Sequence, residues 1–282
     1  MSTTNTQPSS LPNAPIAFIG GGNMASAIIG GLVRQGLPPS DIEVVEPFAE
    51  ARDRLHQQFG ITAQTEASPA LARCKLVVWA VKPQTFHAAA VPTAPHVTQA
   101  LHLSVAAGIG SDSIARWLGV ERIVRAMPNT PALVGQGMTG LFARPAAQPQ
   151  DRALIEQVLA PTGQTLWVDA EAQLDAVTAL SGSGPAYVFF FIEAMTQAGV
   201  DMGLDAQQAQ RLAVATFNGS AALAAASNEP PALLRQRVTS KGGTTYAAIT
   251  ALEAAGVKEH FIAAMRAAQQ RAHELGQEFG AA

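Results

Sequence analysis

Short runs of β-branched and other apolar residues alternate with helical stretches, and this alternation restricts the fold more than any other feature of the sequence. The runs are Ile16–Ile19, Ile42–Val45, Leu76–Val81, Leu101–Val105, Arg122–Arg125, Met138–Phe142 and Thr165–Val168. Parallel strands with helices on both faces bury such runs economically, so the sequence predicts an α/β sheet of about seven strands.

The stretches between these runs have helical patterns. They are Met24–Gln35, Phe48–Phe59, Thr85–Val97, which Pro92 and Pro95 should break, Ser111–Trp117 and Asp151–Leu159. After Asp169 only Ala-rich helical stretches follow, separated by glycines and prolines. We therefore predict a disordered tail over residues 1–13, an α/β domain over 14–169 and an all-helical domain over 170–282.

Composition excludes several classes of partner and favours an oligomer. The 282 residues carry a formal net charge of −3, which leaves no basic field for a nucleic acid. Only 14% of the residues are charged and 48% are hydrophobic. The apolar run Val188–Ile192 indicates a helix covered on every side, as in a subunit interface.

The sequence also predicts a cytoplasmic protein that uses neither a membrane nor a metal. Met1–Asn13 lacks the basic and apolar regions of a signal peptide, and the apolar segment Ala186–Val200 is shorter than the ~20 residues that span a bilayer. The single cysteine, Cys74, fits a reducing compartment. The histidines show no paired metal-ligand spacing.

A glycine-rich motif points to a dinucleotide. Gly20-Gly21-Gly22-Asn23-Met24-Ala25 fits G-x-G-x-x-A, directly follows a predicted strand and opens a predicted helix. Gly20 would allow the tight turn and Gly22 the close approach of a pyrophosphate, which the first helical amides at Asn23 and Met24 would bind. The sequence therefore predicts that the first domain binds a dinucleotide.

Glu46 ends the second predicted strand, about 20 residues after this motif, where an acidic side chain accepts a hydrogen bond from the ribose 2′-hydroxyl of NAD(H). A carboxylate there repels the 2′-phosphate of NADP(H). Glu46 could instead be a solvated loop residue, and Arg52 or Arg54 could swing in to bind a phosphate. On its own, Glu46 favours NAD(H).

Several sequence blocks resemble the pyrroline-5-carboxylate reductase family, in the order found in that family. They are Ala80–Pro83, Ala106–Gly108, Arg125–Pro131, Ser181–Tyr187 and Val238–Thr245. With the glycine motif, they cover nearly everything from Ile16 to Arg271. The family usually has Pro at the position of Lys241 and His-Pro-Gly at Pro230-Pro231-Ala232, so this chain departs from it at two places near the last block.

The resemblance implies an activity and an architecture. It implies reduction of 1-pyrroline-5-carboxylate to L-proline with a nicotinamide cofactor, which is the final step of proline biosynthesis. It also implies a Rossmann-like N-terminal domain, a helical C-terminal domain that pairs with a second subunit, and an active site at the domain and subunit boundary. Most members favour NADPH, in tension with the interpretation of Glu46.

The last block supplies the predicted substrate site. Thr245 matches the family's substrate-contacting threonine and is the candidate to orient the imine nitrogen, although it could instead cap a helix. Amides of the loop that contains Ser240, Gly242, Gly243 and Thr244 could bind the substrate carboxylate. Ser183 lies in the segment Ser181–Gly184, which could form part of the substrate wall, cap the following helix, or do both. Tyr187 is expected to pack rather than act as an acid.

Residues that follow three of the predicted strands should hold the nicotinamide half of the cofactor, because open α/β sheets bind ligands at these ends. They are Ala80, Val81, Lys82 and Pro83, then Ala107 and Gly108, and finally Asn129, whose amide could bond the carboxamide or the ribose. Lys82 could equally be a solvated lysine before a turn proline. Two other functions stay open: a related reductase of another small anion, and a non-catalytic NAD(P)-binding regulator.

Overall fold

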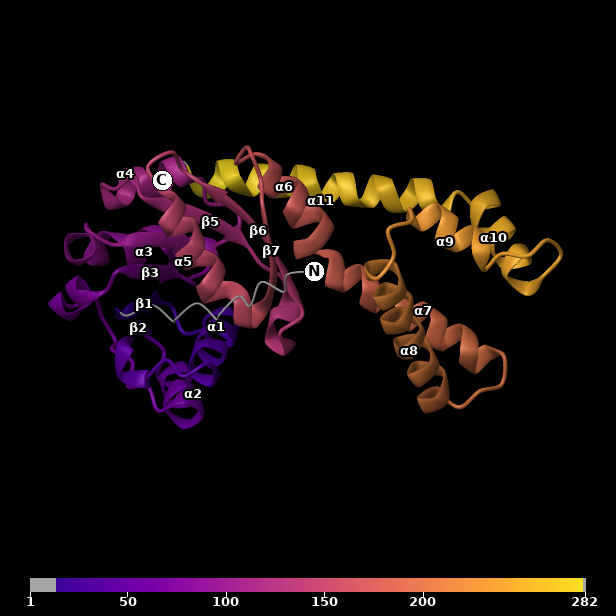
Figure 1. Ribbon diagram of the computed structural model, residues 1–282, viewed down its shortest axis with the longest axis horizontal. Helices are drawn as coiled ribbons and strands as arrows, with labels where there is room; N and C mark the ends of the chain where they lie inside the picture. The colour runs from indigo at the N-terminus through magenta and orange to yellow at the C-terminus, as the bar shows by residue number, and fades with distance from the viewer. Residues whose placement is uncertain (1–13, 281–282) are drawn as a thin grey trace, which may run out of the picture. The chain divides into compact units, whose positions relative to one another are not determined.

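A computed structural model describes residues 14–280, so the predicted tail over residues 1–13 lies outside the described part. Seven strands form one sheet in the order β2-β1-β3-β4-β5-β6-β7 (Figure 1). Their bounds are β1 Ile16–Ile19, β2 Ile42–Val45, β3 Leu76–Trp79, β4 Leu101–Ser104, β5 Ile123–Met127, β6 Gly137–Ala143 and β7 Gly163–Trp167. Each lies at a run that the sequence predicted, and the α/β prediction is confirmed.

One pairing departs from the expected parallel arrangement. β1 to β5 pair in parallel, but β5 and β6 are antiparallel. Only a short link that contains the 3₁₀ turn Thr130–Val134 joins them. A parallel crossover needs a dozen or more residues, so this link can only turn the chain back. β7 then pairs in parallel with β6.

The helices between these strands follow the predicted pattern closely. They are α1 Asn23–Arg34, α2 Ala49–Phe59, α3 Pro83–Thr93, α4 Ser111–Leu118 and α5 Pro149–Leu159. After β7 comes α6 Gln173–Val177, in the stretch that the sequence assigned to the second domain, and a π-helical turn over Thr178–Gly182 continues it. Short 3₁₀ turns lie at Pro39–Asp41, Pro69–Arg73, Ala94–His96 and Ala160–Thr162. Pro92 sits in the last turn of α3, and the chain becomes 3₁₀ directly afterwards, at Pro95.

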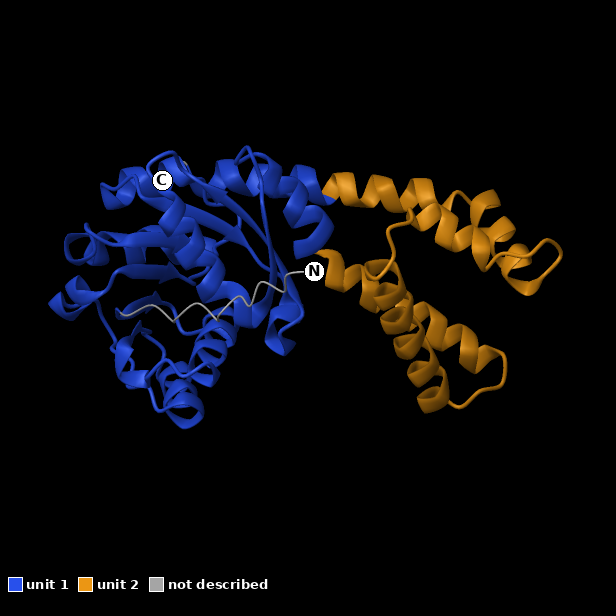
Figure 2. Ribbon diagram, viewed as in Figure 1, with its two compact units in different colours: residues 1–182, 268–282 blue, residues 183–267 orange. Residues whose placement is uncertain are grey.

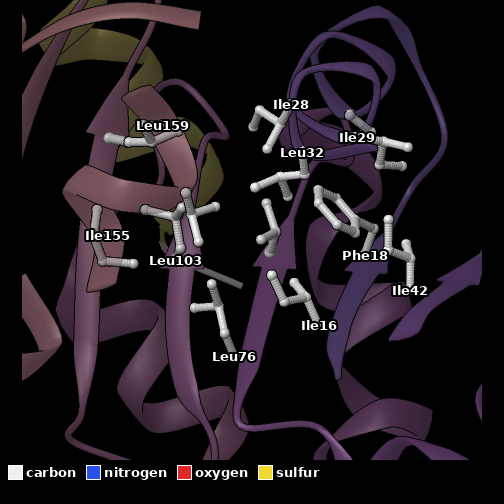
Figure 3. Close-up of a cluster of buried hydrophobic side chains, with 14 of the residues drawn as sticks. Ile16, Phe18, Ile28, Ile29, Leu32, Ile42, Leu76, Leu103, Ile155 and Leu159 are labelled. Carbon is white, nitrogen blue, oxygen red and sulfur yellow. The ribbon is translucent and has the colours of Figure 1, made fainter. Parts of the chain in front are cut away.

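Two hydrophobic clusters sandwich the sheet. Ile16 and Phe18 of β1 belong to the first cluster, with residues of α1 and α5 (Figure 3). Ala17 and Ile19, which alternate with them, belong to the second cluster, with residues of α3 and α4. Successive side chains of a strand point to opposite faces, so a central strand must be apolar throughout, as β1 is.

One titratable side chain lies fully inside the second face of the core. His102 on β4 has no exposed surface; its Nδ1 accepts a hydrogen bond from Trp79 Nε1 at 3.1 Å, and its Nε2 lies 3.1 Å from the carbonyl oxygen of Val97. Since Nδ1 accepts, the proton of the neutral ring sits on Nε2 and is donated to Val97. Burial lowers the pKa of His102 to about 4.

The chain divides into two compact units (Figure 2). Among the described residues, the first unit comprises 14–182 and 268–280, and the second unit comprises 183–267. The predicted boundary at 169/170 therefore falls inside the first unit. The physical reason is that α6 packs on the sheet: a Cβ added to Gly140 of β6 would stand 2.7 Å from Val177 Cγ1.

The second unit is helical. It contains α7 Gly184–Asp201, α8 Ala206–Ala225, α9 Pro231–Arg237 and α10 Thr244–Ala254, together with the first part of α11 Val257–Gly280. Gly199 lets α8 approach α7, because a Cβ there would stand 2.8 Å from Ala209 Cβ. The run Val188–Ile192 is not covered within the single chain: Phe189 and Phe190 are each 65% exposed. Within residues 14–280, no helix has the length and apolarity needed to cross a bilayer.

Candidate functional site

The glycine turn at the end of β1 has a geometry that only glycine tolerates at its first position. Gly20 has φ +97°, and its N–H donates to the carbonyl oxygen of Val45 at the end of β2. A Cβ on Gly20 would stand 2.6 Å from the carbonyl oxygen of Ala80, which follows β3. This residue therefore joins the carboxyl ends of three strands.

Gly22 is required by neither conformation nor packing. It is the N-cap of α1, with φ −74° and ψ −170°, and a Cβ there would meet nothing within 4 Å. No side chain caps α1. The N–H groups of Asn23 and Met24, at the start of the helix, can therefore donate hydrogen bonds to a ligand. Open space beside uncapped amides at the positive end of a helix fits a pyrophosphate.

Glu46 is a fixed, buried carboxylate and not a solvated loop residue. It is 6% exposed, and its oxygens accept hydrogen bonds from the backbone N–H of Gly21 at 2.7 Å and of Phe48 at 2.9 Å. Arg52 Nη1 donates to the backbone oxygens of Glu46 and Pro47. The negative charge therefore stands beside the glycine turn and cannot swing away.

Two of the three segments predicted for the nicotinamide follow the neighbouring strands β3 and β4. The N–H of Ala80, after β3, donates to the carbonyl oxygen of Ile19, and the N–H of Val105, after β4, donates to that of Trp79. Gly108 in the second segment has φ +72°. Lys82 is the exposed N-cap of α3, which is compatible with both of its interpretations.

Asn129 is engaged inside the protein. Its Nδ2 donates to the backbone oxygen and the hydroxyl of Ser181, both at 3.2 Å, and its Oδ1 accepts from the N–H of Met138 at 3.0 Å. The side chain thus links the β5–β6 turn to the π-helical turn. Ser183 is the N-cap of α7, but its side chain makes no capping bond.

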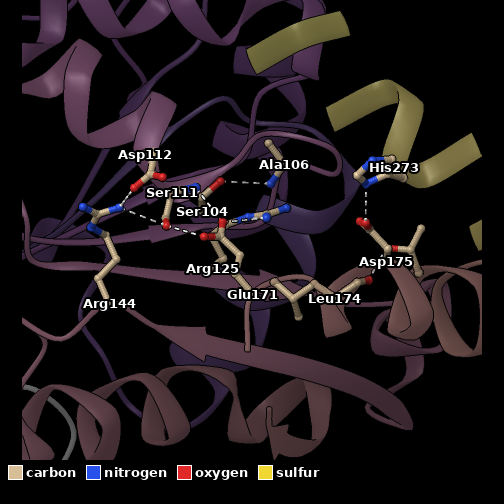
Figure 4. A network of polar contacts seen from close by, with 11 residues as sticks. Ser104, Ala106, Ser111, Asp112, Arg125, Arg144, Glu171, Leu174, Asp175 and His273 are labelled. Carbon is tan, nitrogen blue, oxygen red and sulfur yellow. Dashed lines mark hydrogen bonds and ion pairs between the residues drawn. The ribbon is translucent and has the colours of Figure 1, made fainter. Parts of the chain in front are cut away.

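A polar network that sequence reasoning missed surrounds the start of α4 (Figure 4). Glu171 accepts hydrogen bonds from the N–H of Ser111 at 2.6 Å and from its hydroxyl at 2.5 Å, and it pairs with Arg125 of β5 at 2.8 Å. Arg144 extends the network to Ser111, Asp112 and Glu121. These partners are far apart in the sequence and form no motif, so no local signal could have identified them.

In the second unit, the predicted substrate loop leads into α10. Gly242 has φ +76°, and the N–H of Gly243 donates to the carbonyl oxygen of Ser240 at 3.0 Å. Gly243 is the N-cap of α10 and offers no side-chain cap, so Thr245 is not the capping residue. Thr244 and Thr245 are exposed in the first turn. The loop therefore presents uncapped amides and a threonine together.

Ion pairs fix the segments on either side of this loop. Arg237, at the end of α9, pairs with Glu229, which lies just before α9, at 2.5 Å. Arg235, also on α9, pairs with Glu253 of α10 at 2.7 Å. Thr239 donates to the carbonyl oxygen of Arg235. Tyr187 packs edge-on against Phe261, with ring centroids 5.5 Å apart, in agreement with a packing role. Among the residues that the structure describes, no three His, Cys, Asp or Glu side chains gather as a metal site.

The fold and the glycine turn define a class: α/β proteins with a site for a dinucleotide, followed by a helical part. Two family models match the chain, one described as NADP oxidoreductase coenzyme F420-dependent, over residues 15–108, and one as pyrroline-5-carboxylate reductase dimerisation, over residues 171–275. A pyrroline-5-carboxylate reductase of Pseudomonas aeruginosa is 45% identical over 267 residues, which cover 94% of this chain and 98% of the relative. The chain belongs to the pyrroline-5-carboxylate reductase family, and the resemblance in the motifs is confirmed.

Solved structures agree with this assignment. A pyrroline-5-carboxylate reductase from Coxiella burnetii has a TM-score of 0.86 and 38% identity, covering 93% of this chain and 98% of that one. The pyrroline carboxylate reductase of Plasmodium falciparum, solved with NADP bound, has a TM-score of 0.84 and 26% identity, covering 95% and 100%. The Rossmann-like fold with a helical C-terminal part is confirmed.

Proposed function

We propose that the protein reduces 1-pyrroline-5-carboxylate to L-proline with NAD(P)H, the final step of proline biosynthesis, as a cytoplasmic homo-oligomer. The observation that carries the proposal is the 45% identity to the Pseudomonas aeruginosa reductase, which extends over 94% of the chain and so includes both the predicted cofactor residues and the predicted substrate residues. The uncapped start of α1, with open space at Gly22, supports a dinucleotide in the first unit.

The residues of the second unit suit a small cyclic imine with a carboxylate. Uncapped amides in the first turn of α10, at Thr244 and Thr245, would bind the carboxylate, and Ser240, Gly242 and Gly243 shape the loop that exposes them. The Thr245 hydroxyl would hydrogen-bond the ring nitrogen and keep it protonated, which makes the C=N carbon a better hydride acceptor. Ser183 would line the same substrate site.

The first unit would hold the cofactor. The start of α1, at Gly20, Gly22, Asn23 and Met24, would bind the pyrophosphate. The segments Ala80–Pro83 and Ala106–Gly108 would hold the nicotinamide, which supplies the hydride when bound. Asn129 would act through the turn that it fixes, rather than by touching the cofactor. Lys82 remains a candidate contact.

A single assay tests the reaction. We expect the purified protein to oxidise NADH or NADPH when synthetic 1-pyrroline-5-carboxylate is added, with one proline formed per cofactor consumed. Cofactor binding without turnover would instead support a non-catalytic regulator. Turnover of a different small anion, with none of the pyrroline, would support a related reductase.

The cofactor preference follows from Glu46. We propose that NADH is preferred, because the buried carboxylate is held by two amides and stands where a 2′-phosphate would approach. Glu46→Gln removes the charge and should shift the ratio of kcat/KM toward NADPH by about tenfold. Glu50→Gln, an exposed acid on α2, is the matched control. A tenfold preference of the wild type for NADPH would contradict the proposal.

The helices of the second unit would form the subunit interface. The family model over residues 171–275 describes dimerisation, and the exposed aromatic residues of α7 lie within it. The protein would therefore bind a small-molecule substrate and a second copy of its own chain.

A further inference from the structure

The end of α11, residues 268–280, belongs to the first unit and packs within it. Ala272 is buried there, and Phe279 packs against the second core cluster. His273 Nδ1 lies 3.4 Å from Asp175 Oδ2 (Figure 4). The last turns of the helix are thus held by apolar contacts and a polar one, although they come more than 80 residues after the rest of this unit ends at Gly182.

These turns contact the loop that follows β4. A Cβ on Gly108 would stand 3.3 Å from Leu275 Cβ and 3.5 Å from the backbone nitrogen of Gly276. The same loop carries Ile109, which has no exposed surface. Gly108 adopts φ +72°, and Leu275 and Gly276 bound the space in which its Cβ would stand, so the loop and the α11 end lie next to each other with room for little more than a methyl group between them.

The end of α11 also forms hydrogen bonds with α4, the helix that follows this loop. The carbonyl oxygen of Gly280 accepts hydrogen bonds from Ser113 Oγ at 2.8 Å and from Arg116 Nη2 at 2.9 Å, both on α4. On its other side, α4 is held by Glu171 through Ser111. Loop 105–110 is therefore fixed by contacts with segments distant in the sequence.

We propose that the end of α11, through Leu275, is a positioning element for the nicotinamide. The inference rests on the proposed function, in which Ala107 and Gly108 receive the nicotinamide ring. Leu275 Cβ lies next to this loop at Gly108, whereas the glycine turn at Gly20–Gly22 is held by Val45, Glu46 and Ala80. Loss of the contact should therefore weaken binding of the nicotinamide half and spare the adenine half.

Ligands with and without the nicotinamide separate these two effects. We would measure Kd for NADH and for ADP-ribose, and for NADPH and 2′-phospho-ADP-ribose, on the full-length protein. Leu275→Gly removes the Cβ that faces Gly108, and it should raise Kd for the intact dinucleotide about fivefold to tenfold and Kd for the shortened ligand less than about twofold. Leu275→Ala keeps this Cβ and should retain binding.

Two further variants complete the design. Gln269→Ala changes an exposed residue of the same helix and should leave every Kd unchanged. Ser113→Ala removes one hydrogen bond to Gly280 and should give the same selective loss, about twofold to threefold, even where Leu275→Gly fails to fold.

Equal losses for the two classes of ligand, accompanied by a lower Tm, would show a merely structural role and overturn the inference. No loss in Leu275→Gly would overturn it as well. Failure of the wild type to bind either dinucleotide would refute the proposed function itself, and the inference with it.

Discussion

The two units of the chain use apolar residues in opposite ways. The first unit buries large side chains such as Phe18, Trp79 and Phe86 on the two faces of its sheet. Over residues 183–267, the only buried residues are Gly199, Ala209 and Ala213, while large apolar side chains such as Phe189 and Phe190 are exposed. A unit that buries so little within one chain depends on further surface for its stability, which is what a dimerisation segment would supply.

The largest effect is expected from a substitution that disrupts the subunit contacts of the second unit. Phe190→Asp places a charge on the exposed apolar face of α7, and burying an unpaired charge in an interface costs several kcal/mol. We expect loss of the oligomer in analytical ultracentrifugation and an activity lower by about 100-fold or more. Phe48→Asp, at an exposed phenylalanine of the first unit, is the control and should leave the oligomeric state unchanged.

A change of pH should affect the first unit through its buried histidine. The folded pKa of His102 is about 4, below the 6.5 of the free side chain, so between these values the unfolded chain binds a proton that the folded chain does not. The free energy of unfolding should therefore fall by roughly 3 kcal/mol as the pH drops from 6.5 to 4. Urea unfolding monitored by tryptophan fluorescence measures this loss.

His102→Gln is the matched variant for the pH experiment. The variant should be less stable at pH 7, because glutamine replaces a buried ring with two hydrogen-bond partners. Because glutamine does not titrate, the free energy of unfolding should fall less between pH 6.5 and 4 than it does in the wild type. The Asp151 carboxylate contributes little to this change: its hydrogen bond to Arg122 lowers its pKa from the ordinary value, so most of its contribution to stability is lost below pH 4. A slope in His102→Gln as steep as that of the wild type would assign the effect to other groups.

The substrate half of the site can be tested at Thr245. Thr245→Ala should lower kcat/KM for the pyrroline about 10-fold to 100-fold, because the protonated imine nitrogen loses a hydrogen bond that orients it for hydride transfer. Kd for the dinucleotide should not change. Thr245→Ser keeps the hydroxyl and should retain most of the activity, and equal activity of the alanine variant would exclude this role.

The cofactor half of the site can be tested at Gly22, with the smallest expected effect. Gly22→Ala adds a methyl group that meets no protein atom, so the Tm should change little, whereas Kd for NADH should rise about tenfold because the methyl group occupies the pyrophosphate's space. Gly219→Ala on α8 adds a methyl group to similarly open space and should leave Kd unchanged. An unaltered Kd in Gly22→Ala would remove the pyrophosphate from this turn.

Local patterns were sufficient to predict most of the first unit. Every strand lies at a predicted run, because a buried strand must be apolar over its length and the turns between strands carry their own residue preferences. The reversal of β6 was not predicted, since the direction of a strand depends on the length of the link before it. Glycine spacing predicted the turn at Gly20, but only the contacts show that Gly22 faces open space.

The sequence alone determined the type of each element, the position of the glycine turn and the family, because these follow from the periodicity, spacing and identity of nearby residues. Only the tertiary structure decided that Asn129 bonds Ser181, that Glu171 holds the start of α4, and that α11 ends against Gly108. Each of these contacts joins residues tens of positions apart or more. Such pairs form when the sheet and helices pack, and no local pattern in the chain encodes them.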